Sequence, residues 1–359
     1  MLLAVFATLI ACELVLRATG PDWLTSSMAE TAAGRAVLGE TPNLFAFVEK
    51  EGSSVVRFRP LSAFAAVDRE YRNDIHITPW GTRVTGADAI GSDVVAFAGD
   101  SFTFGLGVND RETFVSLTCR TRHLHCLNAG IPGTSLAAQL DLVAGNFEHW
   151  GRPGRVVFVF FAGNDLPELI RETDQRTRST PPPSSPMLVS LDAFNRAVNS
   201  SDVFRRSYLL RFVKTTARAW AMPDSMDLMF VTAAGAHGDF GRAAEAALSL
   251  SLDRLERLSA QLGFRASFIV LPDRYQVYRP AMIDKARYYR LDPDALDMTF
   301  PQRLLRTQLE RRGIESVDAG ACLDSSRRDL YYEYDNHLTA AGHAAVATCV
   351  EQSSVLDAQ

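Results

Sequence analysis

Five short apolar runs limit this chain to a small set of folds. A strand that is buried on both faces of a parallel sheet reads as a continuous apolar run, whereas a half-exposed strand alternates. Segments with helical spacing lie between several of these runs, and this alternation predicts a doubly wound α/β fold with a five-stranded parallel sheet. The runs occupy residues 94–98, 124–127, 156–161, 266–271 and 314–317, and the predicted helices include 112–120, 136–147 and 248–262.

The rest of the chain divides into an N-terminal region and an insertion. Residues 18–90 carry weak patterns and are predicted to be an N-terminal extension, and the α/β domain follows at 91–359. Residues 165–244 interrupt the sheet between its third and fourth strands, so we interpret them as an insertion near the site. Within this insertion, residues 171–186 are polar and then proline-rich, which is typical of a loop or linker.

Residues 1–17 form a hydrophobic segment at the N-terminus. Among residues 1–16 only Glu13 is charged. A helix of that length covers about 24 Å, which is shorter than the roughly 30 Å apolar core of a bilayer. The segment is predicted to be a membrane anchor or a signal segment, and a buried apolar helix is the alternative. An anchor would hold the protein at the membrane, facing the periplasm or the extracellular side.

Four of the five cysteines fall into two local sets, Cys119 with Cys126 and Cys322 with Cys349. Neither set has the C-x-x-C spacing of metal or redox sites. Two disulfides in an oxidising compartment, with Cys12 unpaired, are the prediction. Four buried free thiols are the alternative, because free cysteine is a common core residue.

Charge and histidine spacing exclude several classes of partner. The net charge is −5 and the basic residues form no dense stripe, so the chain has no electrostatic footprint for nucleic acid. No histidine among His76, His123, His125, His149 and His237 has metal-ligand spacing with carboxylates or cysteines. We therefore predict no metal, no cofactor and no nucleic-acid partner.

Residues with useful chemistry follow the predicted strands. In open parallel α/β sheets, ligands bind outside the carboxyl ends of the strands. Ser101 follows the first apolar run, Gly130 the second and Asn164 the third, and His337 lies just before the last predicted helix. We expect these four residues to converge at one edge of the sheet.

Together these residues are the parts of an acyl-transfer site. A serine hydroxyl is a poor nucleophile until a base takes its proton, and histidine is suited to that role. Asp335, two residues before His337, is predicted to orient the imidazole and to stabilise its cation. The N–H groups of Ser101 and Gly130 and the Asn164 amide are predicted to donate to the developing oxyanion.

The four residues stand in sequence blocks that resemble those of the SGNH hydrolases, also called the GDSL esterase/lipase family. The blocks are GDSFTFG around Ser101, NAGIPGTS around Gly130, AGND around Asn164 and YDNHLTAAGH around His337, in the family's order. The resemblance implies a three-layer α/β/α flavodoxin-like fold, and ester hydrolysis or acyl transfer without a metal or cofactor. Together with the N-terminal segment, GDSFTFGLGV resembles membrane-tethered members near those that O-acetylate polysaccharides.

One position departs from the family pattern. Many members carry an aspartate three residues before the histidine, where this chain has Tyr334. Some polysaccharide-acetylating relatives use an Asp-x-His pair, so Asp335 is the predicted carboxylate. The alternatives are Glu333, or support of His337 by a backbone carbonyl.

Three functions are compatible with these residues. An esterase would form an acyl-enzyme on Ser101 and resolve it with water, acting on O-acyl groups of a glycan or lipid. A polysaccharide O-acetyltransferase would use the same residues with a glycan hydroxyl as acceptor, and a membrane protein would supply the acyl groups. The alternative from another class is a catalytically inactive, membrane-tethered module that binds or assembles glycans on the same fold.

Overall fold

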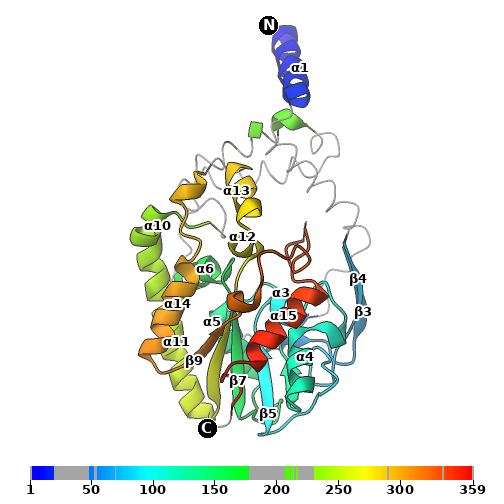
Figure 1. The fold of residues 1–359 in the computed structure, drawn as a ribbon, viewed down its shortest axis with the longest axis vertical. Coiled ribbons are helices and arrows are strands. Elements are labelled where there is room, and N and C mark those ends of the chain that lie inside the picture. The colour runs from blue at the N-terminus through cyan, green and yellow to red at the C-terminus, as the bar shows by residue number, and fades with distance from the viewer. Residues whose placement is uncertain are drawn as a thin grey trace.

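The computed structural model describes residues 2–19, 48–51, 55–68, 70–177, 230–288, 291–333 and 335–357, with part of 207–216. Its centre is a parallel sheet of five strands in the order β6-β5-β7-β8-β9 (Figure 1). In chain order this is 2-1-3-4-5, the flavodoxin-like arrangement, so the predicted fold class is confirmed. The strands are β5 (Val94–Ala98), β6 (His125–Asn128), β7 (Arg155–Phe161), β8 (Arg265–Leu271) and β9 (Glu315–Asp318).

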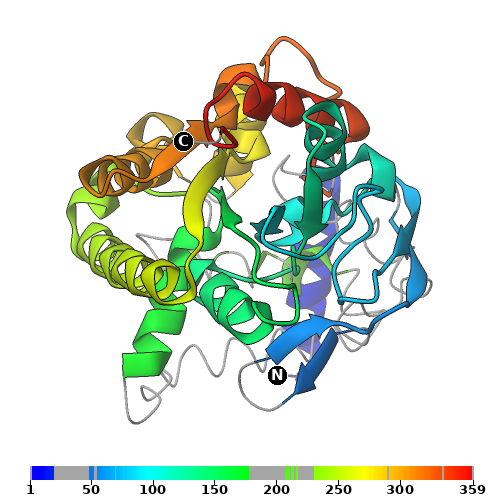
Figure 2. The ribbon, with the colours of Figure 1, turned by 90° about the horizontal axis from the view of Figure 1, so that it is seen from below.

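Helices cover both faces of this sheet, as the view from below in Figure 2 shows. Alternate residues of β7 point into two separate apolar cores: Phe158 and Phe160 face one, and Val159 and Phe161 face the other. The first core is closed by α5 (Leu136–Asn146), α6 (Asp165–Thr177), α11 (Asp239–Leu262) and α14 (Phe300–Arg311). The second core is closed by α4 (Phe114–Thr121) and α15 (Ala340–Glu351).

Short elements connect these layers. The helix predicted at 112–120 begins at Phe114, because the Thr113 hydroxyl caps it by accepting from the Ser116 N–H at 3.1 Å. Helix α11 (Asp239–Leu262) ends just before Gly263, as predicted. Gly263 takes the left-handed conformation, with φ +81°, and terminates the helix. The other connecting elements are α3 (Ser101–Phe104), η2 (Asp110–Glu112), α10 (Ala233–His237), α12 (Arg274–Val277), α13 (Arg279–Tyr288), η3 (Pro293–Ala295) and η4 (Ala319–Cys322).

The predicted insertion at 165–244 is described mainly at its two ends. The expected loop at 171–186 is wrong for 171–177, because these residues continue α6. Leu166 and Leu169 are buried in the first core and hold this helix on the sheet. Residues 178–186 lie outside the described residues.

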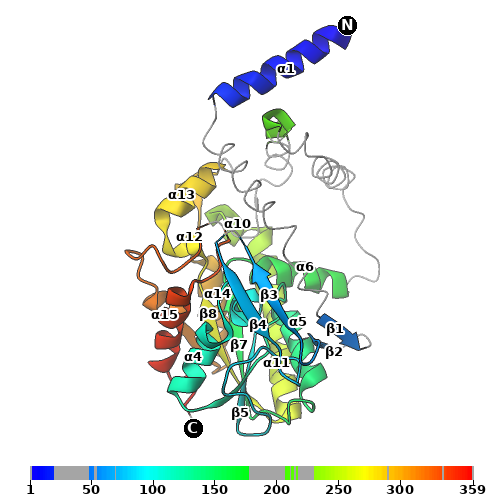
Figure 3. The same cartoon turned by 90° about the vertical axis from the view of Figure 1, so that its right-hand side faces the viewer.

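Residues 55–90 share the core of the α/β domain, although we expected them to be an extension. They contain β2 (Val55–Phe58), which pairs with β1 (Val48–Glu51), and the antiparallel hairpin of β3 (Ala63–Val67) and β4 (Arg72–His76). Phe58 and Ile75 are buried in the first core, and the rings of Phe58 and Phe104 stack with centroids 4.9 Å apart. The core therefore crosses the predicted boundary at residue 91, and Figure 3 shows the β3–β4 hairpin alongside the domain.

The N-terminal apolar segment forms α1 (Leu2–Thr19), which stands away from the sheet in Figure 1. The alternative of a buried helix is wrong, since Leu9, Ile10, Leu14 and Val15 are exposed. Within the described ranges, no helix combines the length and the apolar character that crossing a membrane requires. The predicted transmembrane helix is thus not found there.

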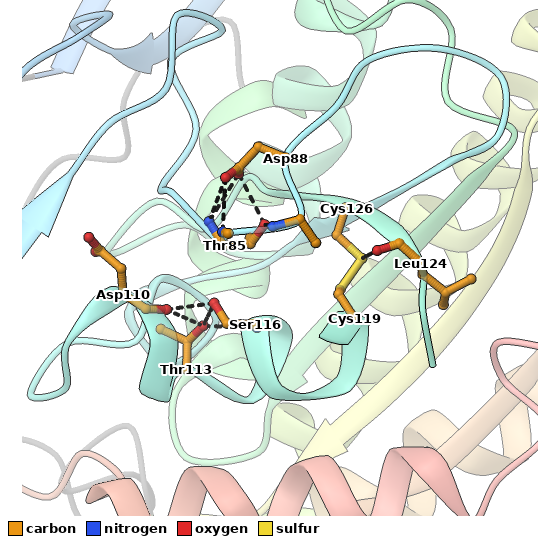
Figure 4. Close-up of a disulfide and its surroundings, with 10 residues drawn as sticks. Thr85, Asp88, Asp110, Thr113, Ser116, Cys119, Leu124 and Cys126 are labelled. Carbon is orange, nitrogen blue, oxygen red and sulfur yellow. Dashed lines mark hydrogen bonds between the residues drawn. A yellow bond between two sulfur atoms is a disulfide. The ribbon is translucent and has the colours of Figure 1, made fainter. Parts of the chain in front are cut away.

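Both predicted disulfides are present. Cys119 on α4 is bonded to Cys126 on β6, with Cα atoms 6.2 Å apart (Figure 4), and Cys322 is bonded to Cys349 with Cα atoms 5.6 Å apart. Both separations lie in the range that a disulfide needs. Cys12 is a free, exposed thiol, as predicted.

Candidate active site

Ser101 begins α3 directly after the first strand of the sheet. The strand β5 is buried along its whole length, and the turn Gly99-Asp100 joins it to α3. The Asp100 carboxylate accepts a hydrogen bond from the Phe102 N–H at 2.9 Å, so it fixes this turn. A β-carbon on Gly99 would lie 1.9 Å from Thr103 Oγ1, so the turn needs glycine here.

The hydroxyl of Ser101, the imidazole of His337 and the carboxylate of Asp335 form one chain of hydrogen bonds. His337 Nε2 lies 2.8 Å from Ser101 Oγ, and His337 Nδ1 lies 2.8 Å from Asp335 Oδ2. A neutral imidazole has one donor and one acceptor nitrogen, so Nδ1–H donates to Asp335 and Nε2 accepts from Ser101. The structure thus brings together the three residues that the sequence pointed to, with Asp335 and not Glu333 next to the imidazole. Tyr334 lies outside the described residues.

Two neighbours hold His337 in place, the loop before α15 and the short helix α3. The Tyr332 N–H donates to the His337 carbonyl at 2.9 Å, which anchors the backbone. The Phe102 ring lies 4.7 Å from the imidazole, so α3 supplies an apolar wall. Thr339 caps α15, because its hydroxyl accepts from the Gly342 N–H.

Asp335 raises the pKa of His337, and His337 lowers the pKa of Asp335, which are the directions that base catalysis needs. Burial lowers the pKa of His337, but the charge of Asp335 and its hydrogen bond outweigh burial and raise the pKa above 6.5. Burial raises the pKa of Asp335, but the His337 charge and hydrogen bonds from His337 and Tyr71 lower it below 3.8. The carboxylate therefore stays ionised when the imidazole takes a proton.

Gly130 lies against the helix that carries the serine. A β-carbon on Gly130 would be 2.2 Å from the Phe104 nitrogen, so only glycine allows this close approach. The Gly130 N–H donates to Asn128 Oδ1 at 3.1 Å, and Asn128 Nδ2 donates to the Thr103 carbonyl at 2.8 Å. To act as an oxyanion donor, the Gly130 N–H must share or exchange its bond to Asn128.

Asn164 follows β7 at the same edge of the sheet. Its Nδ2 donates to Glu168 Oε1 on α6 at 3.3 Å, and this bond uses one of the two N–H groups of the amide. The other N–H is the one that the predicted oxyanion role requires. Burial raises the pKa of Glu168, which favours its neutral, protonated form beside the amide.

Buried carboxyl groups support the loops around Ser101. Burial raises the pKa of Asp100 to about 6 and that of Asp273 to about 6, and burial together with the charge of Asp100 raises that of Asp165 well above its usual value. Asp165 accepts from the Phe161 N–H at 2.9 Å, and Asp273 caps α12. Asp100 and Asp165 thus hold loops through hydrogen bonds from backbone N–H groups.

Sequence reasoning missed Arg83, which fixes the segment after α3. Its side chain is fully buried and donates to the carbonyls of Phe104, Gly105 and Val108 and to the Asp110 carboxylate. All four partners lie more than twenty residues away in the chain, so no local spacing could have revealed this role.

In the part of the chain that the structure describes, no three His, Cys, Asp or Glu side chains are grouped so that they could hold a metal ion. The groups that do converge are a hydroxyl, an imidazole, a carboxylate and an amide. Their chemistry is proton transfer, nucleophilic attack and hydrogen bonding to an oxyanion.

No protein-family model and no curated protein matches the chain. Solved structures similar to it include a putative lipolytic protein of the G-D-S-L family from Desulfitobacterium hafniense, with 14% identity, 72% of this chain and 98% of that chain covered, and a TM-score of 0.37. Another is a psychrotrophic esterase from Pseudoalteromonas, with 10% identity, 73% and 96% covered, and a TM-score of 0.35. A third is a member of the lipolytic G-D-S-L family from Veillonella parvula, with 12% identity, 73% and 98% covered, and a TM-score of 0.37.

Proposed function

We propose that this protein is a serine-dependent carboxylic ester hydrolase of the SGNH type, which works through an acyl-enzyme on Ser101. The proposal is carried by the unbroken hydrogen-bond chain from Ser101 through His337 to Asp335, with 2.8 Å at each link. This chain lies beyond the carboxyl end of β5. The strand order reverses at β5 and β7, which is where flavodoxin-like sheets bind ligands.

Acylation begins when Ser101 Oγ attacks the ester carbonyl carbon while His337 Nε2 takes the hydroxyl proton. Asp335 holds the imidazole in the required tautomer and stabilises its cation. The developing oxyanion accepts hydrogen bonds from the Ser101 and Gly130 N–H groups and from the Asn164 amide. The carbon–oxygen bond to the alcohol then breaks, and His337 returns its proton to the leaving alkoxide.

Deacylation repeats these steps with water as the nucleophile. His337 takes a proton from water as the oxygen attacks the acyl carbon, and the bond to Ser101 Oγ breaks as the proton returns to the serine. The products are a carboxylic acid and the regenerated hydroxyl of Ser101. Each step uses only side chains and backbone groups of this chain.

The proposed substrates are O-acyl groups of a glycan or a lipid. The sequence resemblance to polysaccharide-acetylating proteins supports a glycan, and acid release from an acetylated polysaccharide compared with a triacylglycerol tests the choice. We also propose a location outside the cytoplasm. The Cys119–Cys126 and Cys322–Cys349 disulfides support it, because disulfides persist in oxidising compartments.

The test is covalent labelling together with turnover. Purified protein is treated with a fluorophosphonate and, separately, with p-nitrophenyl acetate, and the labelled residue is located by peptide mass spectrometry. We expect labelling at Ser101 and steady ester cleavage. Ser101→Ala should lose both without a loss of melting temperature, whereas Ser326→Ala, at an exposed loop serine, should keep both.

Other outcomes separate the alternatives. A glycan acceptor that accelerates turnover of the acyl-enzyme and appears acylated in the product would indicate a transferase. A folded protein that takes no label at Ser101 and cleaves no ester would overturn the proposal and favour a glycan-binding module.

A further inference from the structure

The turn between β3 and β4 touches the loop that carries Asp335. The Asp68 N–H donates to the Tyr71 carbonyl at 2.9 Å and closes this turn. Two neighbouring residues of the turn, Glu70 and Tyr71, make contacts to the loop between Tyr332 and His337. These residues belong to the region that sequence patterns predicted to be an extension outside the site.

Glu70 binds the backbone of this loop with both carboxylate oxygens. The Glu333 N–H donates to Glu70 Oε1 at 2.8 Å, and the Asp335 N–H donates to Glu70 Oε2 at 3.0 Å. Hydrogen bonds to an ionised carboxylate are stronger than neutral ones, and two of them fix direction as well as distance. Glu70 thus sets the position of the backbone from which the Asp335 side chain extends.

Tyr71 interacts with the side chain of Asp335. Burial and the charge of the Asp335 carboxylate raise the pKa of Tyr71, and Tyr71 in turn lowers the pKa of Asp335, so the hydroxyl keeps its proton and can donate to this carboxylate. The Tyr71 ring also packs on Tyr332, with centroids 5.0 Å apart. The Tyr332 hydroxyl in turn donates to the Gly107 carbonyl at 2.8 Å, in the segment after Ser101.

The hairpin is also anchored at its far end. The Asp74 N–H donates to Asn109 Oδ1 at 3.2 Å, and His76 Nδ1 lies 2.7 Å from Asp110 Oδ2. Asp110 is the carboxylate that also pairs with the buried Arg83. The turn that carries Glu70 and Tyr71 is therefore joined to the segment after α3 as well as to the Asp335 loop.

We propose that Glu70 and Tyr71 are positioning residues for the Ser101–His337–Asp335 site. Glu70 holds the loop backbone, and Tyr71 holds the carboxylate in the orientation that directs Oδ2 at His337 Nδ1. The inference rests on the proposed function. Positioning matters because the carboxylate stabilises the imidazole tautomer in which Nε2 can accept the serine proton. A carboxylate that turns away from Nδ1–H no longer stabilises this tautomer.

The experiment compares two variants with two matched controls. Glu70→Ala removes both loop bonds, and Asp74→Asn is its control because it removes a negative charge from an exposed side chain of the same hairpin. Tyr71→Phe keeps the ring and removes the donor, and Tyr332→Phe removes a hydroxyl that binds the Gly107 carbonyl instead of Asp335. The measurements are melting temperature, p-nitrophenyl acetate kinetics from pH 5 to 9, and the downfield proton signal of His337 Nδ1–H.

We expect Glu70→Ala and Tyr71→Phe to lower kcat by roughly tenfold or more, the scale of one lost hydrogen bond to a charged group, with a smaller change in KM. Without its Tyr71 donor, the Asp335 carboxylate is more basic and attracts the imidazolium more strongly. The acid limb of kcat/KM and the titration of the Nδ1–H signal should therefore move to higher pH in Tyr71→Phe. Tyr332→Phe should leave both titrations in place, and Asp74→Asn should retain wild-type kcat.

A merely structural role predicts a different pattern. If the two variants lose activity only in proportion to melting temperature, with the acid limb and the Nδ1–H titration unmoved, the inference is overturned while the proposed function stands. If the wild-type protein takes no label at Ser101, the proposed function fails. The Nδ1–H titration still decides whether Tyr71 and Glu70 position Asp335, because it needs no turnover.

Discussion

Glu333 and Asp335 flank position 334, and the backbone conformation places only Asp335 next to the imidazole of His337. Asn336, between Asp335 and His337, has φ +65°, a left-handed conformation that asparagine tolerates better than most residues. This turn brings the Asp335 carboxylate to His337 Nδ1, at 2.8 Å. Glu333 is exposed and contributes its backbone N–H to Glu70.

Asp335→Asn should lower kcat by up to about 10⁴, because an amide donor at this place stabilises the wrong imidazole tautomer. Glu333→Gln is the matched control, and we expect it to change kcat little. Steady-state kinetics with p-nitrophenyl acetate at pH 8 measure both. A larger loss in Glu333→Gln than in Asp335→Asn would show that the carboxylate is assigned wrongly.

The residues of the hydrogen-bond chain were predictable, whereas the residues that hold them were not. Ser101 and His337 stand in recognisable sequence blocks, and the two acidic residues beside Tyr334 limit the carboxylate to Asp335 or Glu333. Glu70 and Tyr71 contact a loop that lies more than 260 residues away in the sequence. No motif or spacing in the sequence indicates this contact. Their region also has short, half-exposed strands, which leave only a weak periodic pattern.

His343 makes folding stability depend on pH without taking part in the chemistry. Its Nδ1 accepts from the Phe114 N–H at 3.1 Å, which ties α15 to α4. Burial, with the nearby charge of Arg83, lowers the pKa of His343 to about 3. Between that value and about 6.5, the unfolded chain binds a proton here and the folded chain does not, so stability falls as pH falls.

His343→Asn keeps an acceptor for the Phe114 N–H and removes the titration. Relative to this variant, the wild-type protein should lose up to about 1.4 kcal/mol of unfolding free energy per pH unit on acidification through the window. Urea unfolding at pH 7 and pH 5 measures the difference, since all other titrating groups are common to both proteins. Equal slopes for the two proteins would refute the assignment.

At the scale of elements, the short helix α3 depends on the loop after β6. Gly130 lets this loop touch the α3 backbone, and Asn128 binds the carbonyl of Thr103 in the same helix. The position of Ser101 is therefore set jointly by the loops that follow the neighbouring strands β5 and β6.

Gly130→Ala should displace α3, because the new methyl group would overlap backbone atoms of Phe104 at 2.2 and 2.8 Å. We expect a loss of about 1–3 kcal/mol in unfolding free energy, typical of overpacking, and a much larger proportional loss of ester turnover. Gly263→Ala is the control: it strains a left-handed residue with open space around it, far along the chain from the site. Full activity in Gly130→Ala would mean that α3 does not need this contact.

The sheet was the most predictable element because four of its five strands, all but β9, are largely buried. Each predicted run overlaps an observed strand, and the ends differ by at most one residue. The helix ends were less predictable where a cap decided them, as at Thr113, and α6 was missed in part because its second half is polar. The hairpin β3–β4 was missed because only part of each strand faces the core.

At the scale of the whole molecule, the two disulfides close loops of different length. Their cysteines are 7 and 27 residues apart in the chain. Chain-entropy arguments give about 2.5 kcal/mol of stabilisation for the shorter loop and about 3.6 kcal/mol for the longer one. The longer loop, between Cys322 and Cys349, encloses both Asp335 and His337.

Replacing Cys322 and Cys349 by alanine should thus cost more unfolding free energy than replacing Cys119 and Cys126, by about 1 kcal/mol. It should also lower ester turnover more, since the loop that carries the base is then tied only by noncovalent contacts. Urea unfolding and kinetics of the two double variants provide the comparison. A larger loss from the Cys119–Cys126 pair would contradict the loop-length argument.

Ser101 and His337 are 236 positions apart in the sequence, and this separation matters while the chain is being synthesised. Chains leave the ribosome from the N-terminus and fold domain by domain. A nascent chain that has emerged as far as β9 contains every strand of the five-stranded sheet and Ser101, but neither His337 nor Asp335. Under the proposed function, reactivity toward esters is therefore the last property that the growing polypeptide acquires, after all five strands have been made.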